Sequence, residues 1–276
     1  MAPHDRSPDR GDPIALSAVG GGRYTPTRRE ALMHGIAHSA PLPLCSTEPW
    51  LHRVGESVPG ATSRLVAGGA VIAPVGATDA TFVVESGAVL VWATVGARPA
   101  VVAALGAGDV LGPEAPSAHS MLRSEARALV PSRVLRLPAA GLGEACRRDG
   151  QLANDLADAR VAGAERVEWR LAVALTMPVR GRVAEALREL ARVGGRPTPA
   201  GMRIELPVTQ ELLSFMTGST RESVNRALQK LTADGSVRRA GRTLIIPVTR
   251  RPVIAPLPPA SRLSTGLSAS NLHATQ

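Results

Sequence analysis

The feature that most constrains this chain is a pair of short helices joined by a glycine turn. Thr209 is a good N-cap for the first helix, because its hydroxyl can accept a free backbone N–H of the first turn. Gly218 can take the positive φ that a sharp turn between helices needs. Thr220, or Ser219, then caps a second helix. Spacings of three and four give each helix an apolar face, formed by Leu212, Leu213 and Met216 in the first and by Val224, Ala227, Leu228 and Leu231 in the second.

The outward face of the second helix carries side chains that suit a DNA major groove. These side chains are Arg221, Glu222, Asn225 and Arg226. Arginine can form two hydrogen bonds to guanine O6 and N7, and glutamate can accept one from cytosine N4. Arg221 and Arg226 are ~7.5 Å apart along the helix axis, roughly two base-pair steps. An ordinary helical hairpin with a solvated charged face is the alternative, but the order of cap, turn glycine and Arg-Glu-x-x-x-Arg favours DNA recognition.

A basic hairpin is expected directly after these helices. Asp234-Gly235 is a turn signal, and residues 237–239 and 243–246 can form two short strands around Ala240-Gly241. The side chains of Arg238, Arg239 and Arg242 would then lie near phosphates, as in the wing of a winged helix. Residues 201–276 contain 10 of the 32 basic residues but only 4 of the 23 acidic ones. This concentration of positive charge is what a phosphate-binding surface requires.

Residues 208–246 resemble the DNA-binding domain of the Crp/Fnr regulators, whose pattern runs roughly TQEDLAxLVGxSRETVNRxLxxLxxxGxI. The resemblance implies that Arg221, Glu222 and Arg226 read bases. It implies further DNA contacts from Thr209, Thr220, Asn225, Arg238, Arg239 and Arg242. Three positions depart mildly from the pattern, namely Leu212, Thr217 and Thr220. The positions that match it are Thr209, Gln210, Glu211, Leu213, Gly218, Arg221, Glu222, Val224, Asn225, Arg226, Leu228, Leu231 and Gly235.

Between about residues 50 and 138, short apolar runs separated by Gly and Pro predict an all-β barrel or roll. Their order resembles the cyclic-nucleotide-binding fold of the same family. We therefore expect an α+β protein with an N-terminal β-roll, a long dimerisation helix and a C-terminal winged helix-turn-helix. The expected segments are a flexible extension at 1–48, the β-roll at 49–140, the dimerisation helix at 141–177, the DNA-binding domain at 178–248 and a flexible tail at 249–276.

A helical pattern runs from about Leu142 to Thr176, and Pro178 ends it. Apolar or small residues recur at spacings of four and three, which we interpret as a seam of heptad type. A helix packed on its own barrel is one interpretation, and the resemblance implies the other, a dimerisation helix. The predicted interface residues are Leu152, Leu156, Ala159, Gly163, Val167 and Leu171.

The segment after Leu105-Gly106-Ala107-Gly108-Asp109 resembles the nucleotide-binding cassette of the family. In that cassette a glutamate binds the ribose and an arginine pairs with the cyclic phosphate. Here Pro113 separates Gly112 from Glu114, and Ser120-Met121 occupies the place of the phosphate-binding arginine. The candidate effector residues are therefore Gly112, Glu114 and the displaced Arg123. Since a buried phosphodiester would lose a charge-assisted pair, we expect that cyclic AMP is not the ligand; substitution by Arg123 is the alternative.

The expected function is a homodimeric transcription regulator that binds a palindromic operator on double-stranded DNA. RNA polymerase and an unidentified small-molecule effector are further expected partners. The alternative is an effector-binding signalling protein in which DNA binding is secondary. No Walker loop, zinc-binding spacing or Gly-x-Ser-x-Gly elbow is present, so we expect neither an enzyme nor a cofactor. With no apolar stretch near 18 residues and no export signal at the N-terminus, we expect a cytoplasmic location and no membrane contact.

Overall fold

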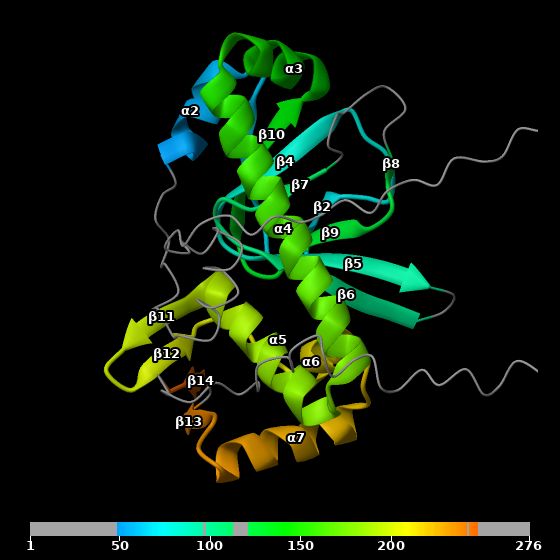
Figure 1. The fold of residues 1–276 in the computed structure, drawn as a ribbon, viewed down its shortest axis with the longest axis vertical. Helices are drawn as coiled ribbons and strands as arrows, with labels where there is room; N and C mark the ends of the chain where they lie inside the picture. The colour runs from blue at the N-terminus through cyan, green and yellow to red at the C-terminus, as the bar shows by residue number, and fades with distance from the viewer. Residues whose placement is uncertain (1–48, 96–97, 113–120, 242, 248–276) are drawn as a thin grey trace, which may run out of the picture. The chain divides into compact units, whose positions relative to one another are not determined.

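The computed structural model describes residues 49–95, 98–112, 121–241 and 243–247 (Figure 1). β-Strands dominate the N-terminal half of this region. Helices and one small sheet form the C-terminal half, which ends in a helix-turn-helix followed by a hairpin. The predicted α+β fold is therefore confirmed.

The N-terminal half is an antiparallel β-roll preceded by helix α2 (Pro49–Ser57). All pairings between its described strands are antiparallel. The first sheet has the order β1 (Thr62–Val66), β10 (Ser132–Pro138), β4 (Ala80–Ser86) and β7 (Val110–Leu111). The second has the order β2 (Val71–Ala73), β9 (Glu125–Ala128), β5 (Val89–Val95) and β6 (Arg98–Leu105). A short pair joins β3 (Gly76–Ala77) to β8 (Met121–Leu122).

The core of the roll is mainly aliphatic. Strand β10 buries residues on both of its faces, because Val134 packs between the two sheets while Leu135 and Leu137 pack in the cluster that includes α2. The inner faces of the two sheets contribute to one cluster that includes Ile72, Val84, Val89, Val91 and Val134. Burial of these side chains from water provides the main driving force for closing the roll.

The predicted helix from Leu142 to Thr176 is in fact two helices, α3 (Ala139–Arg148) and α4 (Gly150–Thr176). The break occurs at Asp149, whose backbone is extended with φ −124° and ψ 99°. Its carboxylate accepts hydrogen bonds from the backbone N–H groups of Gln151 and Leu152, so it caps the start of α4. This local capping outweighs the continuous helical pattern of the sequence.

The C-terminal half begins after Pro178 with α5 (Val179–Gly194). It continues with a hairpin that was not predicted from the sequence, β11 (Gly195–Thr198) and β12 (Gly201–Ile204). Helices α6 (Gln210–Thr217) and α7 (Arg221–Ala233) follow, and then strands β13 (Arg238–Ala240) and β14 (Thr243–Ile246). The sheet order is β11-β12-β14-β13. The predicted helix-turn-helix and wing are confirmed, with β13 starting one residue later than expected.

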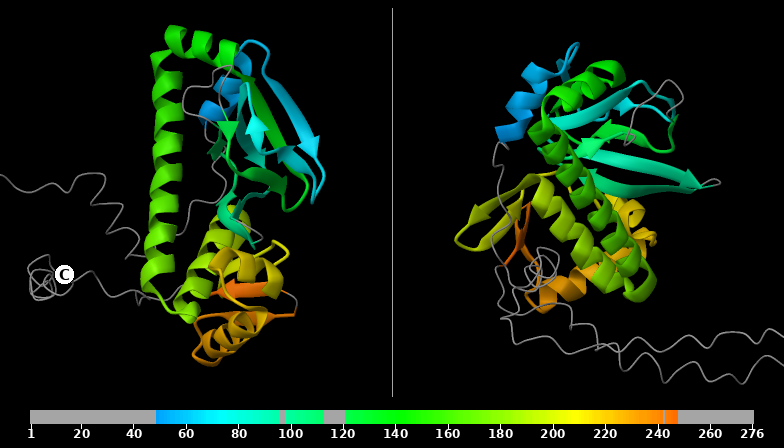
Figure 2. Two further views of the ribbon diagram at one scale, coloured as in Figure 1. Left: turned by 90° about the vertical axis from the view of Figure 1, so that its right-hand side faces the viewer. Right: turned by 45° about the horizontal axis from the view of Figure 1, so that its top comes forward.

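Helix α4 connects the two halves. Figure 2 shows that the described elements lie on one side of α4 along most of its length, so its other side is uncovered by them. None of the helices in the described part of the chain is long and apolar enough to cross a membrane.

Candidate nucleic-acid interface

Helix α6 is fixed at both ends by local hydrogen bonds. Thr209 caps its start, with its hydroxyl accepting from the backbone N–H of Leu212 at 3.0 Å. At its end, Gly218 adopts φ 60° and ψ 33°, a left-handed conformation that glycine takes without steric cost. Both features were predicted. They set the sharp turn that directs the chain into α7.

Helix α7 begins at the predicted cap. The hydroxyl of Thr220 accepts from the backbone N–H of Ser223 at 3.2 Å. The inward residues Val224, Ala227, Leu228 and Leu231 are all buried, as predicted. Because these four residues hold one side of α7 against α5 and α6, the opposite side faces outward.

The outward side of α7 carries the predicted readout residues. The side chains of Arg221, Glu222 and Arg226 are 64%, 77% and 63% exposed. Arg221 forms an ion pair with Glu211 of α6, and Arg226 pairs with Glu222 at 3.1 Å. Exposed ion pairs contribute about 0–1 kcal/mol each, so the arginines can leave these partners for base edges at small cost.

Asn225 lies on the same side, half-buried, beside the start of α6. Its Oδ1 accepts a hydrogen bond of 3.0 Å from Nε2 of Gln210. Gln210 was part of the sequence resemblance but received no predicted role. Its place directly after the N-cap of the first helix is the signal that could have identified it, because side chains there border the second helix.

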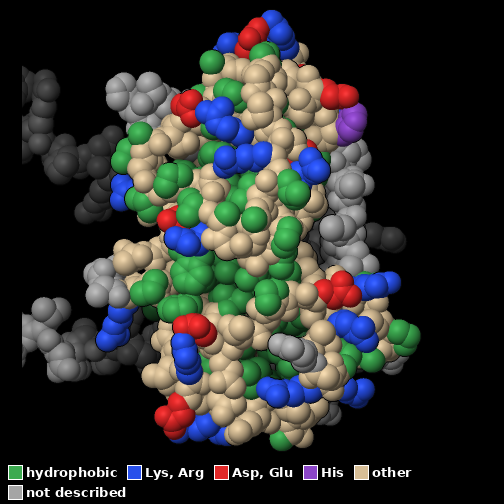
Figure 3. Space-filling view, turned by 180° about the vertical axis from the view of Figure 1, so that it is seen from behind, with side chains coloured by type: hydrophobic (Ala, Val, Ile, Leu, Met, Phe, Trp, Pro, Cys, Tyr) green, Lys and Arg blue, Asp and Glu red, His purple; other side chains and the backbone are tan. Residues whose placement is uncertain are grey.

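The wing adds basic side chains beside α7. Strands β13 and β14 meet at a turn containing Gly241, which has φ 62°. Arg238 and Arg239 are exposed, whereas Arg242 lies outside the described residues. A hollow of about 300 Å³ lies between the wing and the two helices, and its polar lining residues are Gln210, Arg239 and Thr243. On the face shown in Figure 3, basic side chains line the lower part, where the C-terminal elements lie.

The candidate effector residues are not brought together by the described structure. Gly112 follows β7, and its carbonyl accepts a hydrogen bond from Arg160 of α4 at 3.4 Å. Arg160 also donates to the hydroxyl of Thr81 at 3.1 Å. Arg123 is exposed in the turn between β8 and β9, and Glu114 lies outside the described residues. Among the residues that are described, no cluster of three or more His, Cys, Asp or Glu could hold a metal ion.

The predicted dimer seam on α4 needs correction at its N-terminal end. Leu152 and Leu156 are buried in the same core cluster as Trp50, Leu51 and Val54 of α2. They are therefore core residues of the single chain, because α2 and the roll cover that side of the helix. Ala159 packs partly against the same cluster, and Gly163 is half-buried.

The exposed apolar face of α4 lies farther round the helix. Val167 and Leu171, two predicted interface residues, are 48% and 59% exposed. Val161 and Leu175, which the prediction omitted, are 56% and 76% exposed. Together with the exposed Ala157 and Ala164, these four residues form what we call the α4 face. Spacings of four and three also connect 157, 161 and 164, so periodicity alone could not decide between the two rows.

These features define a winged helix-turn-helix protein with an N-terminal β-roll, and comparisons with known proteins agree. Residues 181–251 match the model of the Crp-like helix-turn-helix domain. A stretch of 86 residues is 33% identical to the CRP-like cAMP-activated global transcriptional regulator of Mycobacterium tuberculosis. That stretch covers 31% of this chain and 38% of the relative, so the similarity spans well under half of the curated relative's length.

Solved structures extend the similarity to the β-roll. FixK2 from Bradyrhizobium japonicum is 25% identical, with a TM-score of 0.57 over 67% of this chain and 92% of that one. TTHA1359, a CRP/FNR family regulator from Thermus thermophilus, is 22% identical, with a TM-score of 0.55 over 67% and 93%. The c-di-GMP responsive regulator CLP from Xanthomonas campestris is 20% identical, with a TM-score of 0.55 over 72% and 99%. Residues 181–251 thus match the Crp-like helix-turn-helix family, and the fold of the described residues is similar to that of CRP/FNR regulators.

Proposed function

We propose that this protein is a sequence-specific DNA-binding transcription regulator. The observation that carries the proposal is the outward face of α7, where Arg221, Glu222 and Arg226 are exposed on a helix that is rigidly capped and packed. Arginine and glutamate have the hydrogen-bonding groups to discriminate guanine and cytosine in the major groove. The similarity to transcriptional regulators from Mycobacterium tuberculosis and Thermus thermophilus supports the same proposal.

Phosphate contacts would orient the helix without reading sequence. The exposed Arg238 and Arg239 of β13 would supply positive charge beside the major groove. The N-terminal ends of α6 and α7 present free backbone N–H groups next to the hydroxyls of Thr209 and Thr220, an arrangement that suits a phosphate. We expect these groups to provide sequence-independent affinity.

We propose further that the protein binds DNA as a homodimer through the α4 face. Its large side chains, Val161, Val167, Leu171 and Leu175, are exposed along one side of a 27-residue helix. A second copy of the same face would bury them by two-fold symmetry, since an isologous contact pairs a patch with itself. The operator would then be palindromic, with half-site centres about one helical turn, roughly 34–36 Å, apart.

The proposed DNA binding does not depend on cyclic AMP. The relative from Mycobacterium tuberculosis is described as cAMP-activated, but Pro113 interrupts the Gly112-Glu114 step of this chain. Arg123 is exposed in its turn, which supports its absence from a phosphate site. Saturating cyclic AMP should change DNA affinity by less than about threefold, or ~0.65 kcal/mol. Calorimetry that finds micromolar binding of cyclic AMP, lost in Arg123→Ala, would contradict this part.

Selection of bound duplexes from a random pool tests the proposed function. The wild type should select a palindromic sequence, and Arg226→Ala should bind it ~1–3 kcal/mol more weakly and lose preference at one base pair. Arg196→Ala is the matched control, because Arg196 is exposed in β11 of the same domain but lies outside the readout helix. A wild type that selects no sequence would favour the effector-binding signalling alternative.

A further inference from the structure

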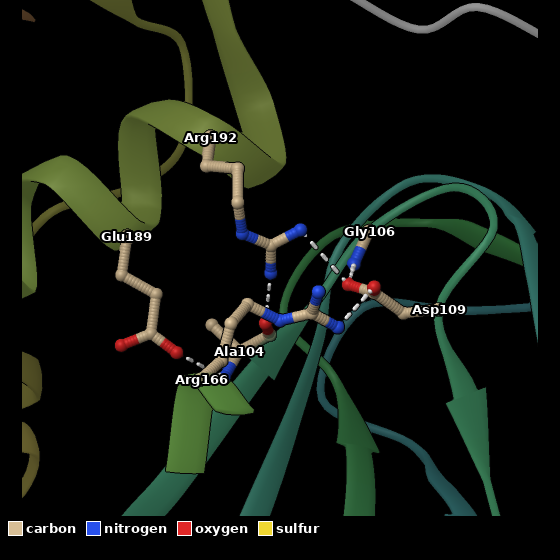
Figure 4. Close-up of polar contacts among 6 residues, drawn as sticks. All are labelled: Ala104, Gly106, Asp109, Arg166, Glu189 and Arg192. Atoms are coloured by element: carbon tan, nitrogen blue, oxygen red, sulfur yellow. Dashed lines mark hydrogen bonds and ion pairs between the residues drawn. The ribbon is translucent and has the colours of Figure 1, made fainter. Parts of the chain in front are cut away.

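A buried carboxylate at the start of β7 is shared by two arginines from different helices. Asp109 ends a tight turn, and its Oδ2 accepts the backbone N–H of Gly106 at 2.8 Å. Its Oδ1 accepts from Arg166 of α4 at 2.5 Å, and its Oδ2 accepts from Arg192 of α5 at 3.0 Å (Figure 4). The carboxylate of the β-roll thus holds both the connecting helix and the first helix of the DNA-binding half.

A second carboxylate makes the reverse connection, from the DNA-binding half to the roll and to α4. Glu189 of α5 accepts the backbone N–H of Ala104 in β6 at 2.8 Å and forms an ion pair with Arg170 of α4. Arg170 also donates to the carbonyls of Val101 in β6 and Met216 in α6, at 2.7 and 3.1 Å. We call Asp109, Arg166, Arg170, Glu189 and Arg192 the β6 clasp.

The β6 clasp satisfies the backbone of an edge strand. β6 is the last strand of its sheet. The N–H of Ala104 is bound by Glu189, and the carbonyl of Ala104 accepts from Arg192 at 2.7 Å. Without α4 and α5 these groups would need water or another strand, as edge strands do. The DNA-binding half therefore docks against the edge strand of the roll, whose outward N–H and C=O groups are not paired with another described strand.

Apolar contacts accompany the polar ones. The rings of Trp92 in β5 and Phe215 in α6 meet edge to face, with centroids 5.2 Å apart and planes at 68°. Leu90 and Val101 of the roll belong to the same buried cluster as Leu187 and Leu213 of the DNA-binding half. This continuous packing leaves α6, and through it α7, one orientation on the roll.

The charges of the β6 clasp are mutually dependent. The side chains of Asp109 and Glu189 are only 9% and 13% exposed. Burial lowers the pKa of the Arg166 guanidinium, and the nearby charge of Asp109 counteracts that effect. Removing one member of such a group leaves the others charged and desolvated, which costs more than losing an exposed pair. We therefore expect that substitution of a single member is enough to undock the DNA-binding half from the roll.

We propose that the β6 clasp is a positioning device that fixes the orientation of α7 relative to the α4 face and so determines which half-site spacing the protein accepts. This inference rests on the proposed function as a dimeric DNA-binding protein. In a dimer joined through α4, the distance between the two recognition helices depends on how each DNA-binding half docks against α4. When the clasp is opened, each recognition helix can still bind one half-site. The distance between the two recognition helices is then no longer fixed.

The first test measures docking without DNA. A Trp50→Phe/Trp169→Phe background leaves Trp92 as the only tryptophan of three, in contact with Phe215. In this background Arg192→Met should move the emission of Trp92 to longer wavelength, because undocking exposes its ring to water. The matched control is Arg188→Met on the same helix, since Arg188 pairs with Glu185 within α5. If Arg192→Met fails to fold, Glu189→Gln removes one clasp charge while keeping an acceptor for Ala104.

The second test measures spacing. The wild type should lose affinity when one or two base pairs are inserted between the selected half-sites. Arg192→Met should bind the uninterrupted site at least about tenfold more weakly, because avidity depends on simultaneous engagement, and should bind a single half-site within about twofold of wild type. It should also no longer discriminate against the insertions, whereas Arg188→Met should behave as wild type.

The outcomes separate the two proposals. A shifted Trp92 emission together with relaxed spacing supports the clasp. Unchanged Trp92 emission in the folded variants, or an unchanged spacing preference, overturns it. A wild type that binds no paired half-sites defeats the proposed dimeric function instead, and the clasp then fails as a spacing device even if Trp92 reports undocking.

Discussion

The side chains of Gln210 and Asn225 are hydrogen-bonded to each other across the two helices of the helix-turn-helix, with Nε2 of Gln210 donating to Oδ1 of Asn225 at 3.0 Å. The bond constrains Asn225, because it engages Oδ1 and leaves the amide nitrogen as a hydrogen-bond donor. It also ties the first residue of α6 to the middle of the recognition helix.

We expect Gln210→Ala to weaken binding to the selected operator by ~0.5–1.5 kcal/mol, the net contribution of one such hydrogen bond. Asn225→Ala should have an effect of similar size, and the double variant should cost less than the sum of the two. A double-mutant cycle on operator affinity measures this coupling. Strictly additive effects would mean that the bond has no influence on DNA binding.

The wing arginine Arg239 should act on every sequence alike. It is exposed in β13 and lines the hollow beside α6, so we expect a phosphate contact and no base contact. Arg239→Ala should weaken selected and random duplexes by the same factor and reduce the slope of log affinity against log salt by about 1. Arg98→Ala, an exposed arginine in the roll, is the control and should leave the slope unchanged.

The helix-turn-helix could be predicted from sequence because its determinants are local. The caps Thr209 and Thr220, the turn glycine Gly218 and the apolar spacing act within one or two turns of helix. The approximate positions of the strands along the chain were predictable for a similar reason, since each short apolar run is bounded by turn residues.

The side of α4 that faces the roll could not be predicted in this way. Leu152 and Leu171 belong to one predicted row, yet the first is buried against α2 and the second is exposed. A straight helix advances about 100° per residue, so Leu171, which follows Leu152 by 19 positions, lies about 100° farther round the axis. The β6 clasp was equally invisible, because Asp109 and Arg192 lie 83 residues apart in the chain.

The α4 face should be sensitive to charge. Leu171→Lys places a cation in the proposed interface and should convert a dimer into a folded monomer, because a charge buried between two apolar faces has no partner. The control is Thr176→Lys, which is exposed on the same helix about 140° round from Leu171. Sedimentation measures the assembly state, and operator binding should be lost together with the dimer.

A dimeric Leu171→Lys variant, or a monomeric wild type that still binds its operator specifically, would contradict this prediction. A monomeric Thr176→Lys would show that the interface lies on another side of α4.

Substitution of Leu156 should affect stability and not dimerisation, in contrast to substitution of Leu171. Because its side chain is buried within the protomer, Leu156→Ala should lower the free energy of unfolding by ~2–5 kcal/mol through lost burial and a residual cavity. The assembly state of the folded protein should not change. Urea unfolding and sedimentation test the two statements, and a stable but monomeric variant would restore Leu156 to the dimer interface.

Asp234, at the end of α7, should make stability depend on pH. Hydrogen bonds from Ser236, first from its side chain and then from its backbone, hold the pKa of Asp234 below its ordinary value of 3.8, and the ion pair with Arg180 acts in the same direction. A depressed pKa means that the unfolded chain binds the proton more readily than the folded one. The stabilisation is therefore complete above pH 3.8 and is lost as the pH falls through the lower, folded value.

Urea unfolding of wild type and Asp234→Asn over a range of pH measures this effect. The wild type should be the more stable protein near neutral pH, and the two should converge in acid below the ordinary pKa of the carboxyl. Arg180→Ala serves as a partial control: because the Ser236 hydrogen bonds are the larger cause, it should keep most of the pH dependence. A stability gap that persists in strong acid, or one that Arg180→Ala abolishes entirely, would show that the hydrogen bonds at the end of the recognition helix are not what holds this carboxylate charged.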